Sequence, residues 1–151
     1  MNYSENFGDV LNRAIDLASR TGGLVCTEHL LYGLAAQTGC VAQRVLGAAH
    51  ISGDDVLQLF TPRNRLTRVT MSTRAARAVS EAEDIARRAG STMMNTEHLL
   101  LAVISDRESV AAQVLEKRWH VDLAAMAEVL TDEINAAARR AANSRGTMTM
   151  D

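Results

Sequence analysis

The chain has 151 residues, of which 47% are hydrophobic, and a formal net charge of -2 at pH 7. A chain of this length can bury one good core, and its charge offers no general attraction to nucleic acid or to membranes. Its two cysteines, Cys26 and Cys40, cannot make a disulfide framework. The sequence shows neither a signal peptide nor an apolar run of about 18 residues, so it predicts a cytoplasmic protein.

The first half of the chain predicts four helices. Abundant Ala and Leu with a single proline favour helix throughout. Ser4 is placed to cap a first helix, whose apolar residues recur at i, i+3, i+4 and i+7 spacing until Gly22-Gly23. Thr27 is placed to cap a second helix, and Ser52 or Asp54 begins a short fourth one. The predicted helices cover about residues 4–22, 27–36, 41–46 and 52–60.

An exposed connector is predicted over residues 61–70, which hold three arginines and the only proline, Pro62. The arginines could contact an acidic partner, but a solvated linker is the favoured interpretation. Helices follow over about residues 72–89, 96–104, 109–117 and 122–142, and no strand-like alternation competes with them. Residues 144–151 are expected to form a flexible tail or the start of a linker.

The second half of the chain repeats the first. The pentad Thr-Glu-His-Leu-Leu stands at residues 27–31 and again at residues 96–100, an offset of 69 residues. Ser4 aligns with Ser72 at an offset of 68 residues, so one residue is gained before the second pentad. The sequence therefore predicts an all-α fold in which two pseudo-symmetric four-helix repeats, residues 3–60 and 71–142, form one compact eight-helix domain over residues 1–143.

These paired motifs carry a family resemblance. Each copy has a helix that begins with a hydroxyl residue, a Gly-containing turn, Thr-Glu-His-Leu-Leu, a short break and Val-Ala-x-x-Val-Leu. From about Tyr3 to Leu130 the chain resembles the double Clp repeat, the N-terminal domain of the Clp family of AAA+ protein unfoldases, and is most similar to the ClpC type. The resemblance implies a domain that sits above an ATPase ring and receives adaptor proteins or substrates before unfolding, and that binds without catalysing.

The residues agree with a binding role. The sequence has no Gly-x-x-x-x-Gly-Lys-Ser/Thr segment, so any ATPase is expected in another domain or chain, and no cofactor is predicted. No metal site is predicted either, because the residues four positions after the pentad histidines are Gly33 and Ala102 and cannot complete a helical zinc pair. Cys26 and His29 have half a zinc spacing, but Asn95 replaces the cysteine in the second copy.

The pentad has a structural interpretation and a functional one. Thr and Glu at the start of a helix satisfy an orphan amide and complement the helix dipole, and His29 and His98 would be partly buried, packing or hydrogen-bonding residues. The resemblance to ClpC-type domains of Gram-positive bacteria implies a phosphoarginine pocket in each repeat. There the Glu meets the guanidinium, and the hydroxyl residue that opens the repeat lies near the phosphate. The matching candidate ligand-binding residues form two pairs, Ser4 with Glu28 and Ser72 with Glu97.

The expected partners are a Clp ATPase ring, adaptor proteins and substrate proteins.

Three alternatives stay open. The chain could be the excised N-terminal domain of an unfoldase, acting in cis, or a free-standing Clp-repeat protein that acts in trans as an adaptor or modulator. A helical DNA-binding protein is the rival from another class, but net acidity and the lack of a basic cluster on the second helix of either copy oppose it. For an enzyme, no nucleophile, base and orienting group stand together.

Overall fold

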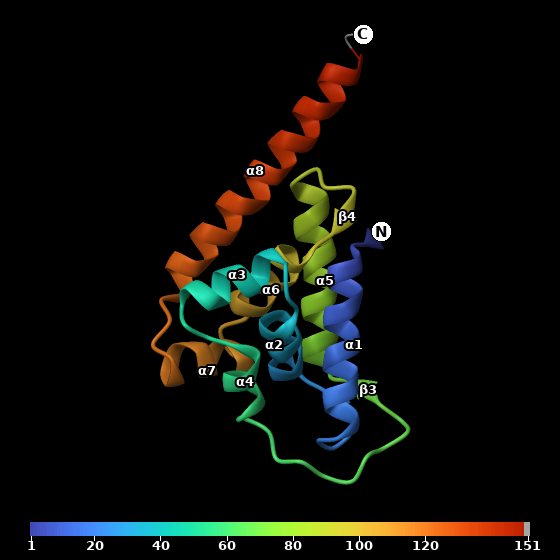
Figure 1. Cartoon of the computed structure of the whole chain (residues 1–151), viewed down its shortest axis with the longest axis vertical. Helices are drawn as coiled ribbons and strands as arrows, with labels where there is room; N and C mark the ends of the chain where they lie inside the picture. The colour runs from blue at the N-terminus through green and yellow to red at the C-terminus, as the bar shows by residue number, and fades with distance from the viewer. Residues whose placement is uncertain (150–151) are drawn as a thin grey trace.

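The computed structural model describes residues 1–149, with side chains placed up to residue 144. These residues contain eight α-helices and four two-residue strands (Figure 1). The helices are α1 (Glu5–Ser19), α2 (Thr27–Ala36), α3 (Val41–Ala48), α4 (Gly53–Leu57), α5 (Thr73–Arg88), α6 (Thr96–Ser105), α7 (Val110–Arg118) and α8 (Leu123–Thr149). The strands are β1 (Asn2–Tyr3), β2 (Leu24–Val25), β3 (Thr70–Met71) and β4 (Met93–Met94). The predicted all-α fold of eight helices is confirmed.

The last helix departs from the prediction. Helix α8 continues to Thr149, whereas a helix to about Ala142 followed by a tail over 144–151 was expected. The continuous run of Ala and Arg before Asn143 carries the helix forward without a Pro or a helix-ending Gly turn. In Figure 1 this helix projects beyond the rest of the molecule. Residues 150 and 151 of the expected tail lie outside the described residues.

One core serves both repeats. Helices α1 and α2 pack together, as do α5 and α6, and α2 and α3 also contact α6, which comes from the other repeat. The buried apolar side chains form a single cluster that runs from Phe7 and Val10 in α1 to Leu130 in α8. Because the aromatic content is only 3%, aliphatic side chains and alanines fill most of this core. The two halves are therefore interlocked.

The short strands cross from one repeat to the other. Strand β1 pairs with β4 in parallel, bringing Tyr3 opposite Met94. Strand β2 pairs with β3 in parallel, bringing Val25 opposite Met71. In Figure 1, β4 lies near the N-terminus and β3 lies at the opposite end of α1. Two-residue strands are too short to show the alternating pattern by which strands are found in a sequence, so none was predicted.

The pentad threonines also cross between the repeats. Cys26 and Asn95 occupy the N-cap positions of α2 and α6, so the prediction that Thr27 caps its own helix is wrong. Instead, Thr27 Oγ1 accepts a hydrogen bond of 3.3 Å from the Ala111 amide in α7, and Thr96 Oγ1 accepts one of 3.3 Å from the Ala42 amide in α3. Each threonine satisfies an orphan amide in the first turn of a helix that belongs to the other repeat.

The connector between the repeats is exposed over residues 61–68, as predicted, and is attached to the end of α1. The Leu66 amide donates to the Ser19 carbonyl at 2.7 Å, and Arg65 forms an ion pair with Asp16 at 3.3 Å. None of the described helices is both long enough and apolar enough to span a membrane.

Candidate functional site

Both predicted serines stand at helix starts. Ser4 caps α1 by accepting a hydrogen bond from the Phe7 amide at 3.2 Å, and Ser72 caps α5 by accepting one from the Ala75 amide at 3.1 Å. Each hydroxyl oxygen acts as the acceptor in its cap, so its proton is not used there. A ligand with acceptor oxygens could take that proton as well as the free amides of the first turn.

Backbone hydrogen bonds place each serine beside a segment of the other repeat. The Ser72 amide donates to the Val25 carbonyl at 2.9 Å, which places Ser72 beside the segment that leads to Glu28. The Ser4 amide donates to the Met94 carbonyl at 2.8 Å, which places Ser4 beside the segment that leads to Glu97. The predicted pairs were Ser4 with Glu28 and Ser72 with Glu97, whereas the backbone places each serine beside the segment that leads to the glutamate of the other pair. The parallel pairing of β1 with β4 and of β2 with β3 is the physical reason, because it crosses the boundary between the repeats.

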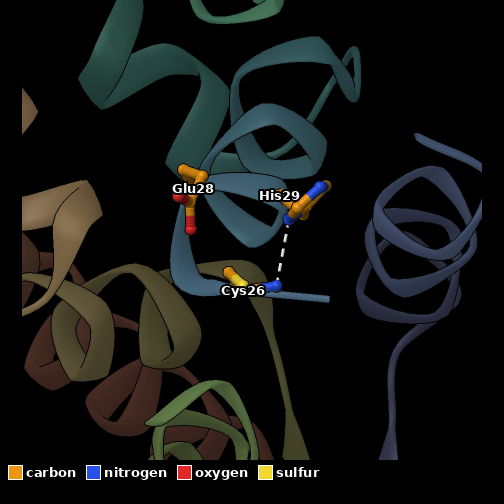
Figure 2. Close-up of side chains that lie close together, drawn as sticks. All are labelled: Cys26, Glu28 and His29. Carbon is orange, nitrogen blue, oxygen red and sulfur yellow. Dashed lines mark hydrogen bonds between the residues drawn. The ribbon is translucent and has the colours of Figure 1, made fainter. Parts of the chain in front are cut away.

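Glu28 lies in the first turn of α2, and one of its two carboxylate oxygens has no partner in the described part of the chain. Its Oε1 atom is buried and has no hydrogen-bond partner among the described residues. Burial raises the pKa of the Glu28 carboxyl above its ordinary value. Figure 2 shows this carboxylate pointing toward the Cys26 thiol, and the Ser72 side chain lies near enough to the same thiol to oppose the rise that burial gives to its pKa. A carboxylate and a serine hydroxyl from different repeats therefore meet around Cys26.

Cys26, Glu28 and His29 place potential ligand atoms within 4.8 Å of one another, but their arrangement does not favour a metal. The Cys26 amide donates to His29 Nδ1 at 2.9 Å, and His29 Nε2 is hydrogen-bonded to Thr21 Oγ1 at 2.9 Å. Both ring nitrogens are thus engaged, and Figure 2 shows the ring on the opposite side of the helix start from the Glu28 carboxylate. A metal ion would have to break one of these hydrogen bonds to gain a histidine ligand.

The second carboxylate is more deeply buried. Glu97 is 6% exposed, and burial raises the pKa of its carboxyl. The Glu97 backbone amide lowers this pKa and the neighbouring carboxylate of Glu133 raises it, while the Asn95 side chain and the positive charge of Arg44 make smaller contributions that lower it. Glu97 lines a pocket of about 220 Å³ between the β4 turn and α8. The residues that line it are Ser91, Thr92, Met93, Asn95, Glu97, His98, Ile134, Ala137, Ala138 and Ala141.

The sequence prediction missed the ion pair near Glu97. Arg44 in α3 pairs with Glu133 in α8 at 2.7 Å. Arg44 aligns with Gln113 at the same offset of 69 residues as the pentads, so a comparison of the two copies could have drawn attention to it. Glu133 lies where α8 extends past the length of its counterpart α4, so the repeat offers no matching position for it.

The pentad histidines have the buried, hydrogen-bonding role that was predicted. His29 and His98 are 5% and 2% exposed. Each accepts a hydrogen bond of 2.9 Å at Nδ1, His29 from the amide of Cys26 and His98 from that of Asn95. Burial lowers the pKa of each histidine to about 4. Both rings are therefore neutral parts of the helix starts at neutral pH.

Comparisons with known proteins agree with this architecture. The chain is 31% identical over 119 residues to the negative regulator of genetic competence ClpC/MecB of Bacillus subtilis (strain 168), a match that covers 75% of this chain and 15% of that protein. The chain thus spans only a small part of that relative's length.

Two solved structures share the fold. The N-terminal domain of the chaperone ClpD from Arabidopsis thaliana superposes with a TM-score of 0.71 at 18% identity, covering 88% of this chain and 97% of that one. The ClpV N-domain in complex with a VipB peptide superposes with a TM-score of 0.55 at 20% identity, covering 82% and 88%. The Clp repeat (R) N-terminal domain family matches residues 70–150, more than half of the chain. The crossed double repeat and this match together show that the chain belongs to the Clp repeat (R) N-terminal domain family.

Proposed function

We propose that this domain recognises substrate and adaptor proteins for a Clp-type ATP-dependent unfoldase, and that phosphoarginine on marked substrates is its ligand. The observation that carries the proposal is the Glu28 carboxylate, whose buried Oε1 lacks a partner while the Ser72 hydroxyl lies close by on the other repeat. Ser4 and Glu97 form the corresponding set at the other end of α1.

The chemistry of phosphoarginine fits this arrangement. A guanidinium can donate two parallel N–H bonds to a carboxylate and so satisfy the unpartnered oxygen of Glu28. The phosphate would accept from the Ser72 hydroxyl and from the free amides at the start of α5. The crossed pairing thus puts Glu28, the acceptor for the guanidinium, on the first repeat. Ser72 and the amides of α5, the donors to the phosphate, lie on the second repeat.

The relatives support a binding role for the whole domain. A ClpV N-domain with this fold has been solved with a VipB peptide, so the fold can bind peptides. In the proposed function, the domain binds and does not catalyse, and it hands its ligands to an ATPase ring. That ring lies either in the same polypeptide, as the similarity to part of ClpC/MecB suggests, or in a separate chain that the domain meets in trans.

Isothermal titration calorimetry with a phosphoarginine peptide tests the proposal. We expect saturable binding that weakens at least about tenfold in the double variant Glu28→Gln with Glu97→Gln, because glutamine keeps the shape but removes the charge that pairs with the guanidinium. The same peptide with unmodified arginine should bind more weakly, since it lacks the phosphate.

Glu128→Gln is the matched control, because Glu128 is an exposed carboxylate on α8 that does not line the pocket at Glu97, and this variant should bind like the wild type. Absence of heat at millimolar phosphoarginine peptide, or equal affinity in the double variant, would show that these carboxylates are not the ligand site.

A further inference from the structure

The connector between the repeats is a fixed surface loop. Three of its amides donate to carbonyls at the end of α1 and in the turn that follows, at 2.7 to 3.0 Å: Arg63 to Arg20, Leu66 to Ser19 and Thr70 to Gly23. Gly23 allows this close approach, because its φ is +84° and a Cβ atom there would lie 2.8 Å from Leu66 Cδ1. The side chains of the connector are therefore presented at defined places on the surface.

This loop brings arginines together around a single aspartate. Arg20 pairs with one oxygen of Asp16 at 3.0 Å, and Arg65 pairs with the other oxygen at 3.3 Å. Arg63 and Arg68 are exposed, and within the described residues their side chains form no ion pair. Four arginines against one aspartate carry a formal charge of +3, so the rest of the chain carries -5 within its total of -2. The sign of this surface is thus opposite to that of the remaining chain.

Two exposed leucines accompany the arginines. Leu66 stands in the connector between Arg65 and Arg68, and Leu24 follows Gly23 in β2. Each leucine is 44% exposed. In Figure 1 the connector lies at the bottom of the molecule, at the opposite end from the last turns of α8. We call these six side chains the basic face: Arg20, Leu24, Arg63, Arg65, Leu66 and Arg68.

The composition of the basic face fits an acidic protein segment. Guanidinium groups pair with carboxylates through parallel hydrogen bonds, and the leucines can contact apolar side chains of the same segment. Because the loop is already fixed, less conformational entropy is lost when a partner binds. A nucleic acid fits less well, since the basic face has no aromatic side chain on which a base could stack and the charge of the remaining chain repels a polyanion.

We propose that the basic face is a docking surface for an acidic segment of a partner protein, one in which carboxylates stand beside leucine-like side chains. The carboxylates pair with Arg63 and Arg68, which have no partner of their own among the residues that the structure describes, and the apolar side chains cover Leu24 and Leu66. The basic face contains none of the four residues proposed to hold phosphoarginine, so this inference goes beyond the proposed function and does not depend on it.

Fluorescence anisotropy with a labelled peptide of glutamates and leucines tests the proposal. We expect saturable binding that weakens as the salt concentration rises from about 50 to about 300 mM, because salt screens exposed charges. The double variant Arg63→Glu with Arg68→Glu should weaken binding at least about tenfold, since it replaces two attractive charges with two repulsive ones. Both side chains are exposed, so circular dichroism should show an unchanged fold. A peptide with glycine in place of leucine should bind more weakly.

The double variant Arg139→Glu with Arg140→Glu is the matched control. It changes the net charge by the same amount, at exposed arginines of α8 far from the connector (Figure 1), and should bind within about twofold of the wild type. Glu28→Gln with Glu97→Gln should also leave this binding unchanged, which separates the inference from the proposed function. Equal weakening by the two arginine variants, no binding at the lower salt concentration, or tighter binding of single-stranded DNA of the same charge would overturn the proposal.

Discussion

At the scale of single residues, the pentad assigns different roles to adjacent side chains. Glu28 has a carboxylate oxygen without a partner, while His29 next to it is fully engaged at both ring nitrogens. A backbone N–H can only donate, so the Cys26 amide requires His29 Nδ1 to be unprotonated. The proton therefore sits on Nε2 and is donated to Thr21 Oγ1, whose own proton goes to the Leu17 carbonyl at 2.8 Å.

These neutral histidines predict a loss of stability in mild acid. Their pKa in the fold is about 4, below the ordinary 6.5, so the unfolded chain binds the extra protons first as the pH falls. The stability they provide is complete above pH 6.5 and is lost progressively between pH 6.5 and about 4. At pH 5 we expect the free energy of unfolding to fall by about 1 to 2 kcal/mol per histidine, measured by urea denaturation.

The double variant His29→Gln with His98→Gln isolates this contribution, because its stability should depend less steeply on pH over the same range. The raised pKa values of Glu28 and Glu97 have the opposite effect on the free energy of unfolding, because burial favours the protonated form of each carboxyl and so stabilises the fold as the pH falls. The wild type and the double variant both keep these two glutamates, so the difference between their pH slopes reports the histidines. Equal pH slopes for the variant and the wild type would contradict the assignment.

The sequence identified the types of residue in the candidate site but not their partners. Ser4 was recognised as a helix cap, and Ser72 as the residue aligned with it at a helix start, from local chemistry that depends on three or four consecutive residues. Which glutamate each serine approaches depends on strands that pair over a long sequence separation, and a repeat seen only as a sequence suggests that each copy is complete in itself. Aligned side chains do not reveal that two copies exchange neighbours.

At the scale of elements, periodicity and caps located the helices well. The starts of α1, α5 and α7 follow Ser4, Ser72 and Ser109, as predicted, because serine satisfies an orphan amide there. The start of α2 was misassigned by one residue, since Thr27 can act as a cap in sequence but is turned toward the other repeat in the fold. The end of α8 was placed too early because the tail lacks an apolar period.

The crossed threonine caps should matter for stability. Thr27→Val keeps the shape of the side chain but removes the hydroxyl, which leaves the buried Ala111 amide without an acceptor. We expect a loss of about 1 to 2 kcal/mol in the free energy of unfolding, from urea denaturation, and a similar loss for Thr96→Val at Ala42. Thr27→Ser retains the hydroxyl and should cost less. If Thr27→Val were as stable as the wild type, the cross-repeat cap would not contribute.

At the scale of the whole molecule, the halves share one core and each completes the other. The apolar cluster includes side chains of α1 to α8 without a break between repeats, and β1 and β3 each pair with a strand of the opposite half. A residue-by-residue alignment of two copies predicts two similar halves but not how they are joined. Their packing depends on the shape of the combined apolar surface.

We therefore expect neither half to fold alone. A fragment of residues 1–60 lacks the strands that pair with β1 and β2 and the threonine that caps α3, so it should show little helix by circular dichroism. Residues 61–151 should be similarly unstable, and mixing the two fragments should restore helix and a cooperative urea transition. A stable, cooperatively unfolding fragment of residues 1–60 would show that the repeats are independent.

The crossing of β1 and β3 has a consequence for the origin of the chain. A single ancestral copy could not have paired its opening strand within itself in this way, but two identical chains related by a two-fold axis could have done so. Fusion of the two genes would then have freed each copy to change on its own. The difference in charge between Arg44 and Gln113 and the difference in length between α4 and α8 are the kind of divergence that a homodimer, whose two subunits share one gene, cannot acquire.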